Sequence, residues 1–428
     1  MGPRWLVLAI LLAALTGRSA VVGQEKVQRP SEDFQKLENF RSGNAPVVVE
    51  NNKNDTEQNR QILDRVARYY AARLNASTTK NEDYRQIRDD AARRMLLPKR
   101  GELNPQQKQF ITEFGKAMIS HLDGLALNSA KPIVRLNAGM IAAEVGRMGY
   151  DGAAELYIKI LEKEDMSDGY KEWALKGLHN LFVIVPELVA PDKTVFQNNN
   201  RGLLSPLERH AIKALINYIE RKVDWTETTP PEEVDGLRYV RREAVRALGH
   251  VRVQTVKNLG NVDSRPAFVL LKVARNDIPS LWPRDPRDQY PTEQLDAIIG
   301  FCRLKPDINV RDFNLDYAVY HLGRAIYSIA EFRVGHGTDA SISWKAAGSW
   351  LREALDTLKT TSNTLKIENA QLVDNLINQC DFNILQPIES GIAGNQPNLG
   401  PLGQWLQANP PKSQSLFKND DATKIKVP

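Results

Sequence analysis

The sequence predicts an all-α protein, and three observations support this fold class. From Asn104 to about Cys380 the chain reads as helix, short loop, helix, with helix-capping residues at several starts. No segment alternates polar and apolar residues as a strand would, and runs of β-branched residues are rare. Related apolar segments also recur at spacings of 33 to 37 residues. Together these features favour stacked helical hairpins over a sheet.

Residues 1–23 differ in kind from the rest of the chain and predict a signal peptide. Arg4 supplies a positive start, Trp5–Leu15 is an unbroken run of 11 apolar residues, and small residues follow up to Gly23. Such a run is too short for a hydrocarbon core about 30 Å thick. We therefore expect export to the periplasm or the outside, with a mature chain that starts near Gln24. An uncleaved N-terminal anchor is the alternative, and it would be the one contact with a membrane.

The composition is that of a soluble globular protein, with 42% hydrophobic and 25% charged residues among 428. Removing Arg4 and Arg18 with the signal leaves 55 basic and 52 acidic residues. This weak positive balance does not predict a nucleic-acid partner. Export would permit a disulfide between Cys302 and Cys380, but the sequence does not say whether they lie within bridging distance.

Residues 24–100 are predicted to hold an irregular segment followed by a helical pair. The polar start contains one short helix candidate, Glu32–Phe40. Two helices follow over about 56–74 and 82–97, the second of which is stopped by a proline. Arginine and aspartate alternate along the second helix, which favours a solvated face with local ion pairs over a binding patch.

Residues 101–389 are predicted to form an array of helical repeats. In the template Val240–Gly249 the apolar residues recur at helical spacing and make one continuous stripe. Related segments are Val134–Ala138, Tyr170–Leu178, Leu207–Leu215 and, as a partial echo, Ala318–Gly323. One hairpin alone leaves its apolar face bare, so stacking is expected to stabilise the array. We expect Ala244 and Leu248 to be buried, Arg242 and Arg246 to be exposed, and Gly249 to end the helix or allow a close helix crossing.

The template resembles the second helix of a HEAT repeat, which carries Asp, then Val-Arg, a small residue and Leu-Gly. The matching residues here are Asp235, Val240, Arg241, Ala244, Leu248 and Gly249. The resemblance covers roughly residues 100–335 and implies an α-solenoid, with a right-handed superhelix, that binds or organises other proteins. An insertion at Pro186–Gly202 and the lack of a unit near 277 depart from the pattern. Another family of α-α hairpin repeats therefore stays open.

The sequence contains no recognisable spacing for catalysis, phosphate binding or metal binding, so we expect no catalytic residues, no cofactor and no metal. The six histidines occur singly, at 121, 179, 210, 250, 321 and 336. Those at 179, 210, 250 and 321 lie within or just after matched repeat segments. Only the stacking of equivalent repeat positions could bring these four together as a metal site.

Arg238, Arg242 and Arg246 are the first candidate binding residues, because a spacing of four places them on one helix ridge. Arginines so arranged could bind carboxylate, sulfate or phosphate groups of a polyanion. The alternative is a solvated helix face that Glu243 and the pair Glu232–Glu233 neutralise.

Trp282 and Tyr290 are the second candidates, since both lie in the proline-rich segment Asp277–Pro291. Loops of this length often have a function. One interpretation is that the aromatic residues contact a partner protein, and the alternative is that they only pack against a neighbouring hairpin.

Residues 390–428 are rich in glycine, proline, asparagine and glutamine, which predicts a largely disordered tail.

For the whole chain we expect a non-enzymatic scaffold that binds another protein, whose identity the sequence does not reveal. The alternatives are an enzyme on a helical fold that acts on an anionic polymer, and a polyanion-binding module that uses the arginine ridge.

Overall fold

The computed structural model describes residues 28–43, 53–97, 103–188, 205–221, 223, 229–256, 259, 264–277, 291–305, 312–336, 342–392, 394–418 and 420–424. Helices hold 77% of these residues. The described part contains no strand, and its β pairings are two isolated bridges, Val253 with Lys305 and Phe313 with Phe417. The predicted all-α class is confirmed. The predicted signal peptide, Trp282 and Tyr290 lie outside the described residues.

The helices of the first half are α2 (Ser31–Ser42), α3 (Lys53–Asn75), α4 (Asn81–Met95), α5 (Pro105–Asn128), α6 (Pro132–Met148), α7 (Ala154–Glu162), α8 (Asp168–Leu188) and α9 (Pro206–Glu220). Those of the second half are α10 (Pro231–Gly249), α11 (Pro266–Ala274), α12 (Pro291–Arg303), α13 (Leu315–His336), α14 (Trp344–Thr364), α15 (Gln371–Cys380), α16 (Gln386–Ser390) and α17 (Gly400–Ala408). Short helical turns lie at Asp151–Ala153, Asp381–Leu385 and Asp421–Thr423.

Two helices, α5 and α9, begin with a polar capping residue followed by a proline, as the sequence indicates. Asn104 caps α5 by accepting a hydrogen bond from the backbone N–H of Gln107 at 2.8 Å. Ser205 caps α9 in the same way, through the N–H of Glu208 at 3.1 Å. Both caps satisfy a backbone donor that the first helical turn leaves free.

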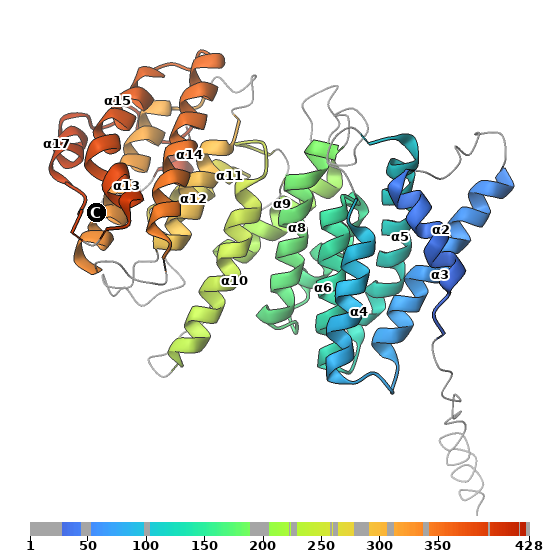
Figure 1. Cartoon of the computed structure of the whole chain (residues 1–428). Coiled ribbons are helices and arrows are strands. Elements are labelled where there is room, and N and C mark those ends of the chain that lie inside the picture. The colour runs from blue at the N-terminus through green and yellow to red at the C-terminus, as the bar shows by residue number, and fades with distance from the viewer. Residues whose placement is uncertain are drawn as a thin grey trace, which may run out of the picture.

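The helices pack in two layers along a row that runs from α2 and α3 at one end to α15 and α17 at the other (Figure 1). In one layer, α4, α6, α8, α10, α12, α14 and α16 each pack against the next of the series. In the other layer, α3, α5, α7, α9, α11 and α13 do the same. Most pairs of helices that follow one another in the chain, such as α5 and α6, pack against each other across the two layers. The apolar core therefore lies between the two layers.

Glycines let neighbouring helices of the first layer cross closely. A Cβ atom on Gly249 of α10 would lie 2.6 Å from the Cα atom of Gly300 on α12. One on Gly146 of α6 would lie 2.8 Å from the carbonyl oxygen of Gly177 on α8. Gly249 is also the last residue of α10, so it serves both roles expected of it. These crossings need glycine because a side chain would collide with backbone.

Burial on α10 agrees with the apolar stripe, but the repeat register is partly wrong. Ala244 and Leu248 are both fully buried. The matched segment Leu207–Leu215, however, lies on α9, which packs across the layers against α10 and beside α7 in the second layer. Helices of both layers need a similar apolar stripe, so the shared residues indicate a common packing requirement and not equivalent repeat positions.

The expected disorder after residue 390 is also wrong for the described part of that segment. Helix α17 packs against α13 and α15, and its Leu402 and Leu406 are buried. Farther on, the Asp316 carboxylate of α13 accepts hydrogen bonds from the backbone N–H groups of Lys412 and Ser413, both at 2.9 Å. Glycine and proline made the composition resemble a disordered tail, while leucines at helical spacing supplied enough apolar surface to dock it.

Cys302 of α12 and Cys380 of α15 are both free thiols in the core. Burial raises the pKa of each thiol to about 12.

Among the described helices, none is both long and apolar enough to cross a membrane.

Candidate functional site

The three arginines singled out from the sequence share α10, but they do not form an exposed ridge. Arg238 is 8% exposed and lies 3.5 Å from a carboxylate oxygen of Asp235. Arg242 and Arg246 are partly buried, and both form ion pairs with Asp296 of α12, the second at 2.9 Å. The prediction that Arg242 and Arg246 are exposed is therefore wrong, because a carboxylate from the neighbouring helix lies against both.

Further carboxylates complete the neutralisation of this helix. Arg246 also donates to Glu243 at 2.8 Å, as the sequence allowed. Beneath the surface, Arg241 forms a two-point ion pair with Glu293 of α12, and both residues are about 95% buried. Sequence reasoning missed Glu293 and Asp296, which lie 50 or more residues after their partners. Paired guanidinium groups have fewer N–H donors left for an incoming polyanion.

Around these ion pairs, one surface collects polar and aromatic side chains from three successive helices of the first layer. We call it the α8–α12 surface, and it consists of Trp173, Lys176 and His179 of α8, Tyr239, Arg242 and Arg246 of α10, His250 directly after α10, and Asp296 and Arg303 of α12. The three helices stand side by side in the middle of the row (Figure 1). Helical spacing explains the surface, because residues three or four apart project from the same side of each helix.

Tyr239 is the most prominent aromatic residue of the α8–α12 surface. It is 48% exposed. The ammonium group of Lys176 lies 5.7 Å from the centre of the Tyr239 ring and 4.3 Å from that of Trp173. Lys176 also pairs with Glu172 at 2.5 Å, which fixes the ammonium group between the two rings. The surface therefore presents a held aromatic and cationic cluster across α8 and α10.

His179 and His250 stack against each other at the same surface. Their ring centres are 4.9 Å apart and the rings are 27° from parallel. Arg303 Nη1 lies 3.2 Å from His250 Nε2, which must accept this hydrogen bond because a guanidinium can only donate. Burial and then the charge of Arg246 lower the pKa of His179 to about 4. Burial, His179 and Arg303 lower the pKa of His250 to about 3. Both rings are therefore neutral near pH 7.

The packing of α8 against α10 thus brings two of the four repeat histidines together, although they lie one position apart in the repeat register, where His179 aligns with Gly249. His210 instead pairs with Glu162 at 2.7 Å, and His321 is buried on α13 beside the rings of Tyr317 and Tyr320. Within the described part of the chain, no three His, Cys, Asp or Glu side chains lie close enough to hold a metal ion.

Replacing His179 and His250 with glutamine is expected to change how stability depends on pH. An unfolded histidine has a pKa of about 6.5, well above the folded values. As pH falls from about 6.5 to 4.5, the unfolded state takes up protons that the folded state does not, so the native protein loses stability. The double variant lacks this loss. Its free energy of unfolding relative to the native protein should therefore rise by roughly 4 kcal/mol over this interval, about 2 kcal/mol for each histidine.

Urea unfolding of both proteins between about pH 7.5 and pH 4.5 measures this difference. Buried Glu208, whose pKa is raised to about 8 by burial, titrates in the opposite sense, but it does so in both proteins and cancels. His210→Gln is the matched control, because the His210 side chain is 50% exposed and lies outside the pair. A pH-independent difference between native and double-variant protein would contradict the assignment.

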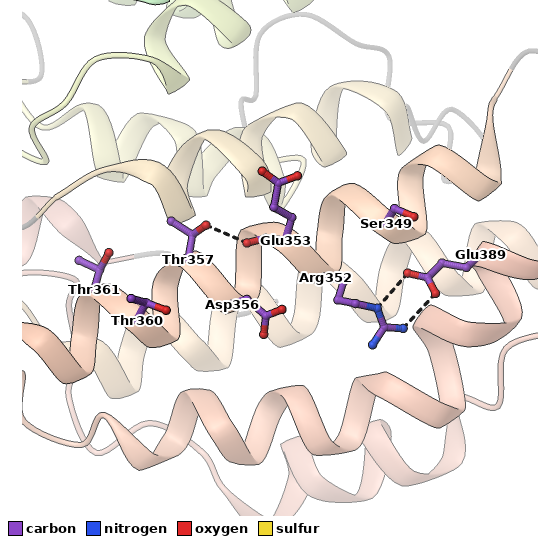
Figure 2. Close-up of a pocket in the computed structure, with 8 residues that line it drawn as sticks. All are labelled: Ser349, Arg352, Glu353, Asp356, Thr357, Thr360, Thr361 and Glu389. Carbon is purple, nitrogen blue, oxygen red and sulfur yellow. Dashed lines mark hydrogen bonds and ion pairs between the residues drawn. The ribbon is translucent and has the colours of Figure 1, made fainter. Parts of the chain in front are cut away.

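A second polar region lies along α14, where Figure 2 shows an open pocket of about 490 Å³. Its lining consists of Ser349, Arg352, Glu353, Asp356, Thr357, Thr360, Thr361 and Glu389. Arg352 is held by Glu389 at 2.9 and 3.0 Å and by Asp381. Glu353 and Asp356 are exposed to solvent. Paired carboxylates in a closed, water-excluding cleft would indicate acid–base catalysis, whereas these two lie open to water.

No protein-family model matches the chain, and no curated protein matches it either. The function is therefore inferred from the residues of this chain alone.

Proposed function

We propose that this protein is an exported, non-enzymatic scaffold that binds another protein through the α8–α12 surface. The observation that carries this proposal is the convergence of Tyr239, Trp173 and Lys176 from two packed helices, with Tyr239 about half exposed. Tyrosine, tryptophan and arginine are the residues that most often carry binding energy at protein interfaces. A rigid aromatic group on a surface also loses little conformational freedom on binding.

The proposal includes the architecture that presents this surface. We take the two-layer row of helices to be an α-solenoid of HEAT-like hairpins with a right-handed superhelix. Support comes from the successive packing of same-layer helices and from the glycine crossings at Gly249 and Gly146. In such an array each hairpin contacts its neighbours, so long surfaces are available to a protein partner.

The electrostatics of the α8–α12 surface favour a folded protein over a polyanion as the partner. Arg242 and Arg246 already share Asp296, and Arg246 also bonds to Glu243. A polyanion would have to compete with these carboxylates for the guanidinium groups. A protein can instead cover the exposed aromatic group while the neighbouring ion pairs stay intact, since protein interfaces combine apolar contacts with polar groups.

Export is part of the same proposal and rests on the sequence of residues 1–23. The short apolar run with a positive start and a small-residue exit is typical of a signal peptide. We therefore expect the partner among exported or membrane-anchored proteins.

The experiment isolates the partner from the exported fraction with the native protein as bait, and then measures the Kd of the purified pair. Tyr239→Ser is expected to weaken binding by about tenfold or more, because an exposed aromatic contact group is lost. Trp350→Ser is the control, since Trp350 is 44% exposed on α14 of the same layer but lies outside the surface. The proposal fails if Tyr239→Ser binds like the native protein, or if Trp350→Ser loses as much affinity.

A further inference from the structure

A separate pocket of about 600 Å³ lies at the N-terminal end of the row, between α3 and α4. It is lined by Arg29, Tyr69, Tyr70, Arg73, Gln86, Ile87, Asp89, Asp90 and Arg93. Its volume is within the range of small-molecule sites. Its lining residues lie before α2 and on α3 and α4, and none of them belongs to the α8–α12 surface.

The two carboxylates of the pocket are already engaged by arginines of their own helix. Asp89 lies 3.7 Å from Arg85 and 3.6 Å from Arg88. Asp90 lies 3.7 Å from both Arg93 and Arg94. It also accepts a hydrogen bond from the Tyr70 hydroxyl at 2.9 Å. Little of their negative charge is left to neutralise the opposite wall.

That opposite wall carries two arginines that aromatic rings hold in place. Arg73 donates to the Tyr69 hydroxyl at 3.1 Å and lies 5.9 Å from the centre of that ring. Arg29 lies over the Phe34 ring, 4.6 Å from its centre. Among the described residues, neither Arg29 nor Arg73 has a carboxylate partner. Because a guanidinium has five N–H donors, both groups keep several donors for a ligand.

We propose that this pocket binds a small ligand through an oxyanion group, which Arg73 and Arg29 hold. The fork of a guanidinium matches the paired oxygens of a carboxylate, phosphate or sulfate. Contacts with Tyr69 and Phe34 position the two guanidinium groups before the ligand arrives, which lowers the entropy lost on binding. The amide of Gln86 and the Tyr70 hydroxyl supply neutral polar groups for the rest of the ligand. The alternative is a set of surface charges that only neutralise one another. In that case Arg29 and Arg73 would be expected to have carboxylate partners among the described residues, and they line the pocket without one.

Calorimetric titration of the full-length native protein tests the site with three probes at constant ionic strength. Inorganic phosphate, sulfate and glucuronate are titrated up to about 10 mM, a range that detects millimolar affinity. The proposal expects saturable binding of at least one probe, and the preferred probe distinguishes a phosphate or sulfate ligand from a carboxylate. Heats no different from those of matched chloride for all three probes would overturn it.

Arg73→Gln and Arg29→Gln are each expected to weaken the binding of the preferred probe by about tenfold or more, because each removes charge-assisted hydrogen bonds. Arg68→Gln is the matched control, since it removes the same charge from α3 at a side chain that is 65% exposed, and neither Arg68 nor its partner Asp64 lines the pocket. Thermal unfolding checks the fold of each variant, and Arg29→Gln keeps the test valid if Arg73→Gln is unstable. Equal weakening in Arg68→Gln would assign the binding to general charge and contradict the site.

Discussion

Replacing Glu293 with alanine is expected to lower the free energy of unfolding by about 3–5 kcal/mol. The carboxylate of Glu293 receives both the Nε and an Nη group of Arg241, and these two residues are 5% and 4% exposed. Removing the carboxylate leaves a charged guanidinium in the core between α10 and α12. An arginine does not give up its proton there, so the cost of the buried charge remains.

Urea unfolding followed by circular dichroism measures this loss. Glu353→Ala is the control, because Glu353 is an exposed carboxylate on α14 of the same layer (Figure 2), and its loss should cost no more than about 0.5 kcal/mol. The double substitution Arg241→Met with Glu293→Leu should recover most of the stability, since it removes both charges and fills the space. A loss below about 1 kcal/mol for Glu293→Ala would contradict a buried ion pair at this interface.

Gly249→Ala and Gly236→Ala are expected to change stability in opposite directions, although both replace a glycine by alanine on α10. A methyl group at Gly249 would meet the Cα atom of Gly300 at 2.6 Å, and backbone cannot move aside as a side chain can. We expect a loss of about 1–3 kcal/mol or more from this overpacking. At Gly236 nothing lies within 4 Å, so the better helix propensity of alanine should add up to about 1 kcal/mol.

The same urea unfolding experiment compares the two variants. Their difference reports mainly the close crossing of α10 and α12, since helix propensity favours alanine more in the helix interior at Gly236 than at the helix end at Gly249 and cannot account for a loss at Gly249 of this size. Two changes of the same sign and size would contradict the crossing.

The sequence predicted local features of this fold well, because their causes lie within a few residues. Asn104 and Ser205 identify helix starts by their own capping chemistry, and the apolar stripe of α10 identifies the buried Ala244 and Leu248. The repeat register was harder to predict. Both layers use similar small and apolar residues, so a segment of α9 resembled its neighbour α10 across the core.

The candidate surface depends on contacts that the sequence could not specify. Helical spacing placed Arg242 and Arg246 together, but Asp296, which neutralises both, follows Arg246 by 50 residues on another helix. The stacking of His179 with His250 was only partly open to prediction, because the two follow matched repeat segments but lie one position apart in the repeat register. Tyr239 carried no special signal, because its exposure depends on how the neighbouring helices pack.

The central claim is that Tyr239 belongs to a protein-binding surface, and site-specific photo-cross-linking tests it most directly. A benzophenone amino acid replaces Tyr239 in one protein and Trp350 in another, and each is irradiated in the exported fraction. We expect one discrete protein adduct from position 239. Excess unlabelled native protein should suppress this adduct, and position 350 should not form it. No adduct at position 239, or the same adducts from both positions, would contradict it.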